Sequence, residues 1–154
     1  MDSNKNKTYG LVMADEEDQL SRILLGWLNQ FPGKPDFIDR VDYEFLDKTT
    51  GMAMSTVQST YKTKLYILGG YEAQYQFKII YRIQPGDSNN KRLEADELLN
   101  RYGDWAANRT DKPVLGSGKR VLRIECNTRS SLFARYDDGS EDHQILLNMI
   151  YEVV

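Results

Sequence analysis

The sequence contains few of the residues on which disulfides, metal sites and nucleophilic catalysis depend. Its 154 residues include one cysteine, Cys126, and one histidine, His143. One cysteine excludes an internal disulfide framework, and a small buried strand residue is the simplest interpretation of it. One imidazole beside Glu141 and Asp142 lacks the spacing of recognised metal sites. We therefore expect His143 to lie in a solvent-exposed turn, and we expect no bound metal.

Long apolar runs are also missing. No segment approaches the length of a membrane span, and the first ten residues, MDSNKNKTYG, lack the apolar core of a signal peptide. Hydrophobic residues make up 40% of the chain and charged residues 28%, as in ordinary globular domains. We expect a protein that is assembled in the cytoplasm and makes no membrane contact.

A nucleophilic site would have to combine Cys126 with His143, because the chain has no second histidine to act as a base. Nothing in the sequence brings the two residues together, although a hairpin between them would allow it. The segment GSGK at 116–119 lacks the full phosphate-loop pattern and precedes a predicted strand rather than a helix. We expect no enzymatic activity and no cofactor. A small α+β enzyme with a Cys126–His143 site is the alternative.

The most regular pattern in the chain lies between Ser55 and Ile83. Two runs, STVQSTYKTKLYIL and YEAQYQFKIIYRI, flank the pair Gly69-Gly70. In the second run, apolar and aromatic residues alternate with polar ones, and Ile80 is the single apolar exception, which is the period of a strand with one buried face. A Gly-Gly pair suits two-residue turns that require positive φ. We predict one long projecting β-hairpin.

Two helices and further strands are predicted around this hairpin. Apolar residues recur at three- and four-residue spacings over residues 14–31 and 90–107, as in amphipathic helices. Further strands are predicted within residues 37–46, 120–135 and 143–154. This order predicts an α+β fold in which two helices pack on one face of a mainly antiparallel sheet of about five strands. We expect a flexible tail over residues 1–13 and a single domain over residues 14–154.

Charge is distributed unevenly along the chain. Residues 51–83 carry four basic side chains and one acidic, whereas residues 137–154 carry five acidic side chains and no basic ones. Patches of opposite sign suit head-to-tail contacts between subunits, but solvated faces explain the pattern equally well. Basic residues among tyrosines also favour a small nucleic-acid-binding module as an alternative. Two observations oppose that alternative: the net charge is −3, and most of these tyrosines fall on the alternate positions that are predicted to face the core.

Four segments together carry a resemblance: LLGWLNQF, KTKLYILGGYEAQYQFKIIYRI, LEADELLNRYGDWAANR and ILLNMIYEVV. Their order over residues 14–154 resembles the tail terminator proteins of tailed bacteriophages and prophages, often labelled minor capsid proteins. The resemblance implies a structural virion protein that forms a ring, usually a hexamer, in the neck at the head-proximal end of the tail. Such a ring ends tube polymerisation, contacts the tail tube protein and the head–tail connector, and passes DNA without specific binding. A head-completion or neck adaptor protein is the alternative within virion assembly.

The resemblance also implies where contacts form. The candidate residues for contact with neighbouring subunits and the tube lie on the polar parity and tip of the hairpin: Lys62, Lys64, Tyr66, Leu68, Gly69, Gly70, Glu72, Gln74, Lys78 and Arg82. Two acidic segments are predicted to line the channel, because like charge keeps DNA from sticking. The candidate channel-facing acids are Asp39, Asp42, Glu44, Asp137 and Asp138.

Overall fold

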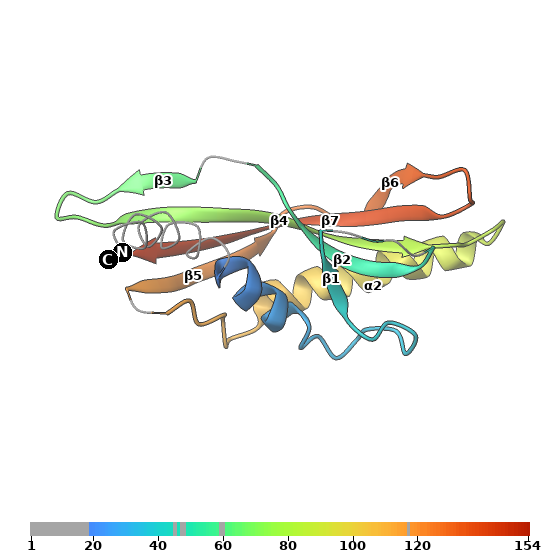
Figure 1. Ribbon diagram of the computed structural model, residues 1–154, viewed down its shortest axis with the longest axis horizontal. Helices are drawn as coiled ribbons and strands as arrows, with labels where there is room; N and C mark the ends of the chain where they lie inside the picture. The colour runs from blue at the N-terminus through green and yellow to red at the C-terminus, as the bar shows by residue number, and fades with distance from the viewer. Residues whose placement is uncertain (1–18, 45, 47–48, 59–60, 117) are drawn as a thin grey trace, which may run out of the picture.

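The computed structural model describes residues 19–44, 46, 49–58, 61–116 and 118–154, and the tail predicted over residues 1–13 lies outside them. Helices pack against a sheet in an elongated arrangement, which confirms the predicted α+β class (Figure 1). The first helix is described over residues 19–28. The other elements are β1 (Val41–Tyr43), β2 (Gly51–Thr56), β3 (Lys62–Leu65), β4 (Tyr71–Ile83), α2 (Asn89–Asn108), β5 (Lys119–Cys126), β6 (Ser131–Arg135) and β7 (Glu141–Val153).

The centre of the sheet is the antiparallel pair β4–β7, two strands of 13 residues each. They pair along their whole length, from Tyr71 opposite Val153 to Ile83 opposite Glu141. Alternate side chains of both strands point toward the helices, and most of them are buried. The two-residue alternation in the sequence therefore determines which face of the sheet is covered.

Shorter strands extend the central pair on both sides. β2 and β3 share the outer edge of β4, and β5 and β6 share the outer edge of β7. β1 joins β2 in parallel, so the sheet is mixed. Within the described residues the sheet has seven strands rather than about five. The difference arises because each flank of the central pair is divided into two short strands.

The long hairpin is not confirmed in its predicted form. Its second arm is the single strand β4, but its first arm is interrupted between the end of β2 and the start of β3. The β3–β4 ladder also contains a register shift between Lys62 and Lys64. A bulge of this kind adds local twist, which turns the end of the arm away from a flat sheet.

The turn of this arm is longer than the predicted Gly-Gly pair. The Tyr66 amide donates to the Gly70 carbonyl oxygen at 3.2 Å, and the Gly69 amide donates to the Tyr66 carbonyl oxygen at 3.3 Å. Ile67, Leu68 and Gly69 therefore form a three-residue loop. Such loops end in a residue of positive φ, and Gly69 supplies it at +97°.

Both helices cover the same face of the sheet. The buried residues of α2 are Ala95, Leu98, Leu99, Tyr102, Gly103 and Ala106. The first helix meets α2 through aromatic rings, with centroids 4.9 Å apart for Trp27 and Trp105. The Tyr102 hydroxyl donates to the Leu28 carbonyl oxygen, which satisfies a buried polar group at this junction. Neither helix, over its described residues, is long and apolar enough to span a membrane.

Gly103 allows α2 to approach the sheet closely. A Cβ atom at this position would lie 2.5 Å from the Cys126 Sγ atom and 3.2 Å from the Ile145 Cδ1 atom. Glycine is unfavourable inside a helix, so its place in the middle of α2 is explained by this contact rather than by helix propensity.

We predict that Gly103→Ala lowers the free energy of unfolding by about 1–3 kcal/mol, because the added methyl group overpacks the helix–sheet contact. Chemical denaturation measures the change. In a Cys126→Ala background the same substitution should cost less, since the sulfur atom is gone. An equal cost in both backgrounds would contradict the role that we assign to this contact.

Candidate interaction surfaces

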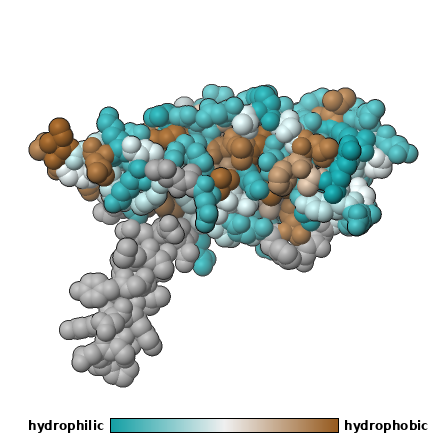
Figure 2. Space-filling view, turned by 90° about the horizontal axis from the view of Figure 1, so that it is seen from above, coloured by the Kyte–Doolittle hydropathy of each residue, from teal (hydrophilic) through white to brown (hydrophobic). Residues whose placement is uncertain are grey.

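The β3–β4 turn presents large apolar side chains to solvent at one end of the molecule. Ile67 and Leu68 have relative exposures of 101% and 100%, and Leu65 is 72% exposed. Figure 2 shows apolar atoms gathered at this outermost end. The Tyr66 hydroxyl donates to the Glu152 carboxylate at 3.3 Å, which ties the base of the turn to β7. Neighbouring aliphatic groups left in water at the end of a braced arm are typical of a protein contact.

The two glycines of the turn have different surroundings. A Cβ atom at Gly69 would meet nothing within 4 Å, whereas at Gly70 it would lie 2.3 Å from the Val153 carbonyl oxygen. Gly70 also has a φ of +81°. A side chain at Gly70 would therefore strain the fold, so substitution there cannot isolate a contact with a partner. Leu68 is the better position for that test.

Lys62 and Lys64 lie on the exposed strand β3, all four residues of which are exposed. The Lys62 Nζ atom lies 4.4 Å from the centre of the Tyr71 ring. Lys64 makes no ion pair with another described residue. The structure thus places both predicted lysines beside the apolar turn.

The remaining predicted contact residues lie on the face of β4 that the helices leave open: Glu72, Gln74, Lys78 and Arg82. All four are half-buried. The Asn148 amide donates to the Gln74 side chain at 3.0 Å, and the Lys78 Nζ atom lies 4.8 Å from the centre of the Phe133 ring. The structure brings these residues together on one face and partly engages them with neighbouring strands.

Arg82 is held by several internal contacts. Its Nε and Nη2 atoms donate to the two Asp142 carboxylate oxygens at 2.7 and 2.9 Å, and its Nη1 atom donates to the Leu46 carbonyl oxygen at 2.9 Å. The Tyr136 hydroxyl donates to Asp142 at 2.7 Å. The side-chain hydrogen bond to Asp142 is the main reason why the pKa of Arg82 lies above its ordinary value. This fork joins β4, β7 and two loops.

Three of the predicted channel-facing acids lie on or beside β1. Asp39 is exposed, and Asp42 pairs with Arg40 at 2.9 Å. Glu44 accepts hydrogen bonds from the amide and the hydroxyl of Thr56, both at 2.8 Å. Burial raises the pKa of Glu44, but its hydrogen bonds outweigh burial and leave the pKa below its ordinary value. Glu44 therefore fastens the chain beyond β1 to β2, whereas Asp39 faces solvent.

Asp137 and Asp138, the other predicted channel-facing acids, are exposed in the turn between β6 and β7. Asp138 accepts from the Ser140 hydroxyl at 2.6 Å, and this bond is the main cause that lowers the pKa of Asp138. The Gln84 amide donates to the Asp138 carbonyl oxygen at 2.8 Å. β1 pairs with β2, and β2 pairs with the later half of β4. Both acidic segments therefore lie in the half of the sheet that is farther from the β3–β4 turn.

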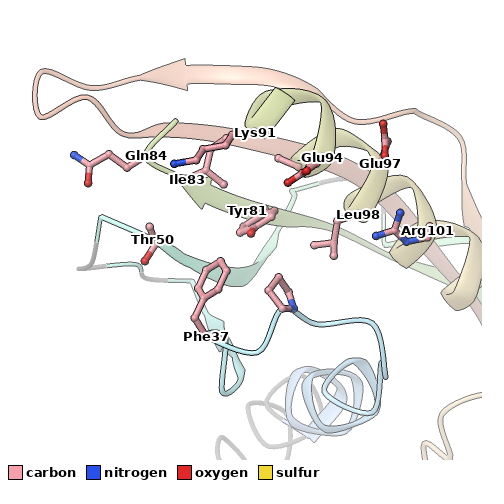
Figure 3. A pocket seen from close by; sticks show the side chains of 12 residues that line it. Phe37, Thr50, Tyr81, Ile83, Gln84, Lys91, Glu94, Glu97, Leu98 and Arg101 are labelled. Atoms are coloured by element: carbon pink, nitrogen blue, oxygen red, sulfur yellow. The ribbon is translucent and has the colours of Figure 1, made fainter. Parts of the chain in front are cut away.

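A pocket that the sequence did not predict opens beside the C-terminal end of β4. Its volume is about 510 Å³, and it lies between the first half of α2, the end of β4 and the loop before β1. Its apolar walls are formed by Pro35, Phe37, Tyr81, Ile83, Ala95 and Leu98. Its charged rim is formed by Lys91, Glu94, Glu97 and Arg101. The rings of Phe37 and Tyr81 face the space that Leu98 borders from α2 (Figure 3).

The prediction that His143 lies in a solvent-exposed turn is wrong. His143 lies within β7 and is 2% exposed, and Glu141 and Asp142 beside it are buried as well. Its Nδ1 atom lies 2.8 Å from Asp96 and its Nε2 atom 3.3 Å from Glu141. The physical reason is that β7 begins at Glu141, two residues earlier than predicted, so alternate residues of this acidic stretch face α2.

Glu141 lies at the centre of this buried cluster. Arg92 donates to its carboxylate from Nε and Nη2 at 2.9–3.1 Å, and Arg135 donates from Nε at 3.2 Å. The hydrogen bond from Arg92 is the main cause that holds the pKa of Glu141 below its ordinary value, and His143 and Arg135 add to it. The charged carboxylate thus joins α2, β6 and β7.

Cys126 and His143 do not meet. Cys126 is opposite Leu147, four residues along β7 from His143, which is about 13 Å at the rise of a strand. The Cys126 thiol donates to the Thr128 carbonyl oxygen at 3.4 Å, and burial raises the pKa of the thiol. Among the residues that the structure describes, no group of three or more His, Cys, Asp or Glu side chains is placed to hold a metal ion.

Comparisons with known proteins give a limited likeness. No family model matches the chain. No curated protein matches it. Among solved structures, the chain is similar to one in the virion of a native gene transfer agent particle, with a TM-score of 0.48 and 15% identity over 71% of this chain and 77% of that chain. A second solved chain, described without a function, gives a TM-score of 0.41 and 12% identity over 90% of this chain and 92% of that chain.

We predict that Glu141→Gln lowers the free energy of unfolding by about 2–4 kcal/mol at pH 7, because it removes the charged acceptor of a buried cluster. The folded-state pKa of Glu141 is lowered. Its stabilisation is therefore present above the unfolded pKa of about 4.3 and is lost as the pH falls through the folded value. Denaturant titrations at pH 7 and pH 3 should show the difference between variant and wild type shrinking in acid.

Asp104→Asn is the matched control, because Asp104 pairs with Arg129 at 3.0 Å with both side chains more than half exposed. An exposed pair of this kind contributes at most about 1 kcal/mol. If the two substitutions destabilised the protein equally, the buried cluster would not have the role assigned to it.

Proposed function

We propose that the protein is a structural virion protein that forms a ring of six subunits at the head-proximal end of a phage tail tube. The ring ends tube polymerisation and joins the tail to the head connector. The observation that carries the proposal is the arm that ends in fully exposed Ile67 and Leu68, since a monomer gains no stability from such groups. The resemblance of the segments over residues 14–154 to tail terminators supports it.

The unlike ends of the molecule suit a ring. One end carries the apolar β3–β4 turn, and the other carries the acidic turn between β6 and β7 (Figure 1). The pocket lies toward this second end, beside the last residues of β4. A contact that joins unlike ends is heterologous, and heterologous contacts produce a closed ring when the rotation between neighbours closes. An elongated subunit reaches from one neighbour to the next.

The sheet supplies further surfaces for the tube and the connector. β3 is exposed along its whole length and offers an edge to which a partner strand can add. Lys62 and Lys64 are exposed on this strand, where they can select an acidic partner. On the open face, Gln74 lies just beyond the part of β4 that pairs with β3, and Lys78 lies beside β2.

We expect the wild-type protein to arrest growth of tubes formed by the tail tube protein of the same genome. Electron microscopy should show shorter tubes with ring-capped ends, compared with tube protein polymerised alone. Native mass spectrometry of the protein, alone or bound to tubes, should give six copies of the 17.8 kDa chain.

Tubes that grow uncapped in the presence of the protein would contradict the proposed termination. Binding to isolated head connectors without any effect on tubes would favour the head-completion alternative. A stable monomer in every mixture would remove both virion assignments.

We also propose that the exposed acids Asp39 and Asp137 face the path of the DNA. The double variant Asp39→Asn with Asp137→Asn is expected to form rings normally but to slow DNA ejection, because the like-charge repulsion that limits sticking is reduced. Ejection kinetics from particles that contain the variant measure the effect. Asp104→Asn, another exposed acid, serves as the control. Ejection at the wild-type rate in the double variant would contradict this placement.

A further inference from the structure

The apolar turn at the end of the β3–β4 arm has no partner among the described residues. We call it the hairpin knob, formed by Leu65, Ile67 and Leu68, whose exposures range from 72% to 101%. The loop that carries it is braced by backbone hydrogen bonds between Tyr66 and Gly70 and between Gly69 and Tyr66. The knob is therefore an ordered projection rather than a loose chain end.

The pocket beside the other end of β4 is similarly unfilled by described residues. We call it the end pocket. Its walls are mainly apolar, and Phe37 leaves 65% of its surface exposed at the mouth. A volume of about 510 Å³ falls within the range of pockets that bury a ligand or a small group of side chains. Two aliphatic side chains fit such a space.

The knob cannot reach the end pocket of its own chain. The two surfaces adjoin opposite ends of β4, whose 13 residues span about 40 Å at the usual rise of a strand. β4 is paired with β7 along this entire length, so the strand cannot fold back on itself. A knob that fills the pocket must belong to another molecule.

We propose that the hairpin knob of one subunit inserts into the end pocket of the next subunit, so that the partner at this contact is a second copy of the chain. The inference rests on the proposed ring and identifies its subunit contact. Ile67 and Leu68 enter between Phe37 and Leu98 and release water from both apolar surfaces. Because knob and pocket differ, the contact has a direction and each subunit uses both surfaces.

The charges beside the two surfaces support this choice of partner. Lys62 and Lys64 flank the knob, whereas Glu94 and Glu97 stand on the rim of the pocket. The rim also has two basic residues, and Glu72 beside the knob supplies an acid for them. Neither Lys64 nor Glu97 forms an ion pair with another described residue. These charges are therefore available to fix the register of the two subunits.

Two double variants test the contact. The knob variant carries Ile67→Asp and Leu68→Asp, and the pocket variant carries Phe37→Asp and Glu94→Trp, which removes one wall and fills the space. Each variant alone should lose the ring, with self-association weakened about 100-fold or more. Analytical ultracentrifugation measures the mass in solution.

Mixing the two variants gives the sharper result. The knob variant retains its pocket and the pocket variant retains its knob, so one junction can form but cannot continue. We expect a 1:1 heterodimer and nothing larger. Native mass spectrometry with one variant isotope-labelled identifies its composition.

Matched controls separate the contact from folding and from general loss of hydrophobic surface. Val114→Asp changes another aliphatic residue that is 83% exposed and should leave the ring intact. Thermal unfolding should show wild-type stability for the knob variant, since its two side chains contact solvent only. Phe37→Asp alone replaces the pocket variant if the double substitution unfolds.

The outcomes separate this inference from the proposed function. Rings that persist in both variants would overturn the inference and leave the tail ring standing. If both variants lost the ring but their mixture formed no heterodimer, the knob would belong to a different contact, and the inference would also be overturned. A pocket variant that forms rings but fails on tubes would assign the pocket to a tube protein instead. A heterodimer together with wild-type protein that does not cap tubes would keep the inference and remove the function.

Discussion

The full-length pairing of β4 with β7 is the constraint on which the rest of the structure depends. Thirteen residues of each strand are matched without a register shift, so the faces of the two strands alternate together from one end to the other. One face of this ladder receives both helices, and neither described helix covers the other face. The strands β2, β3, β5 and β6 attach to its two outer edges, and β1 joins the sheet through β2. The ladder also sets the distance between the two ends of the molecule.

Charged pairs on the two faces reinforce the register of this ladder. On the helix side, Glu141 meets Arg92 of α2, and on the open side the next residue, Asp142, meets Arg82 of β4. Because successive side chains of a strand point to opposite faces, a slip of one residue would turn each carboxylate away from its arginine. Both carboxylates are only 4% exposed, so such a slip would leave charges buried without partners. Burial thus makes these two pairs specific for one register.

The sequence predicted the parts of the fold that follow from local periodicity. The alternation from Tyr71 to Ile83 identified β4 and its buried face, and the apolar spacing around Leu98 and Tyr102 identified α2. It did not predict the burial of Glu141 and His143, because burial there depends on the cross-strand register and on charges supplied by α2. Periodicity within a segment carries no information of that kind.

The same limit explains why the hairpin tip was a candidate contact from sequence and the end pocket was not. Leu68 lies beside two glycines, a local sign of a turn, whereas the pocket forms only when Phe37, Tyr81 and Leu98 meet from three separate segments.

The structure also separates the residues that stabilise the fold from those free to mediate assembly. Gly70 and Tyr66 brace the arm, but Ile67 and Leu68 contact solvent alone, so the knob contributes no packing to the isolated subunit. A contact formed through such residues releases all of its hydrophobic free energy on association. The ladder between knob and pocket sets the relative orientation of these two surfaces, because strand twist accumulates along β4 and fixes the angle between the two ends of the subunit. In a ring built from this contact, the number of subunits therefore depends on the ladder as well as on the docking angle at the contact.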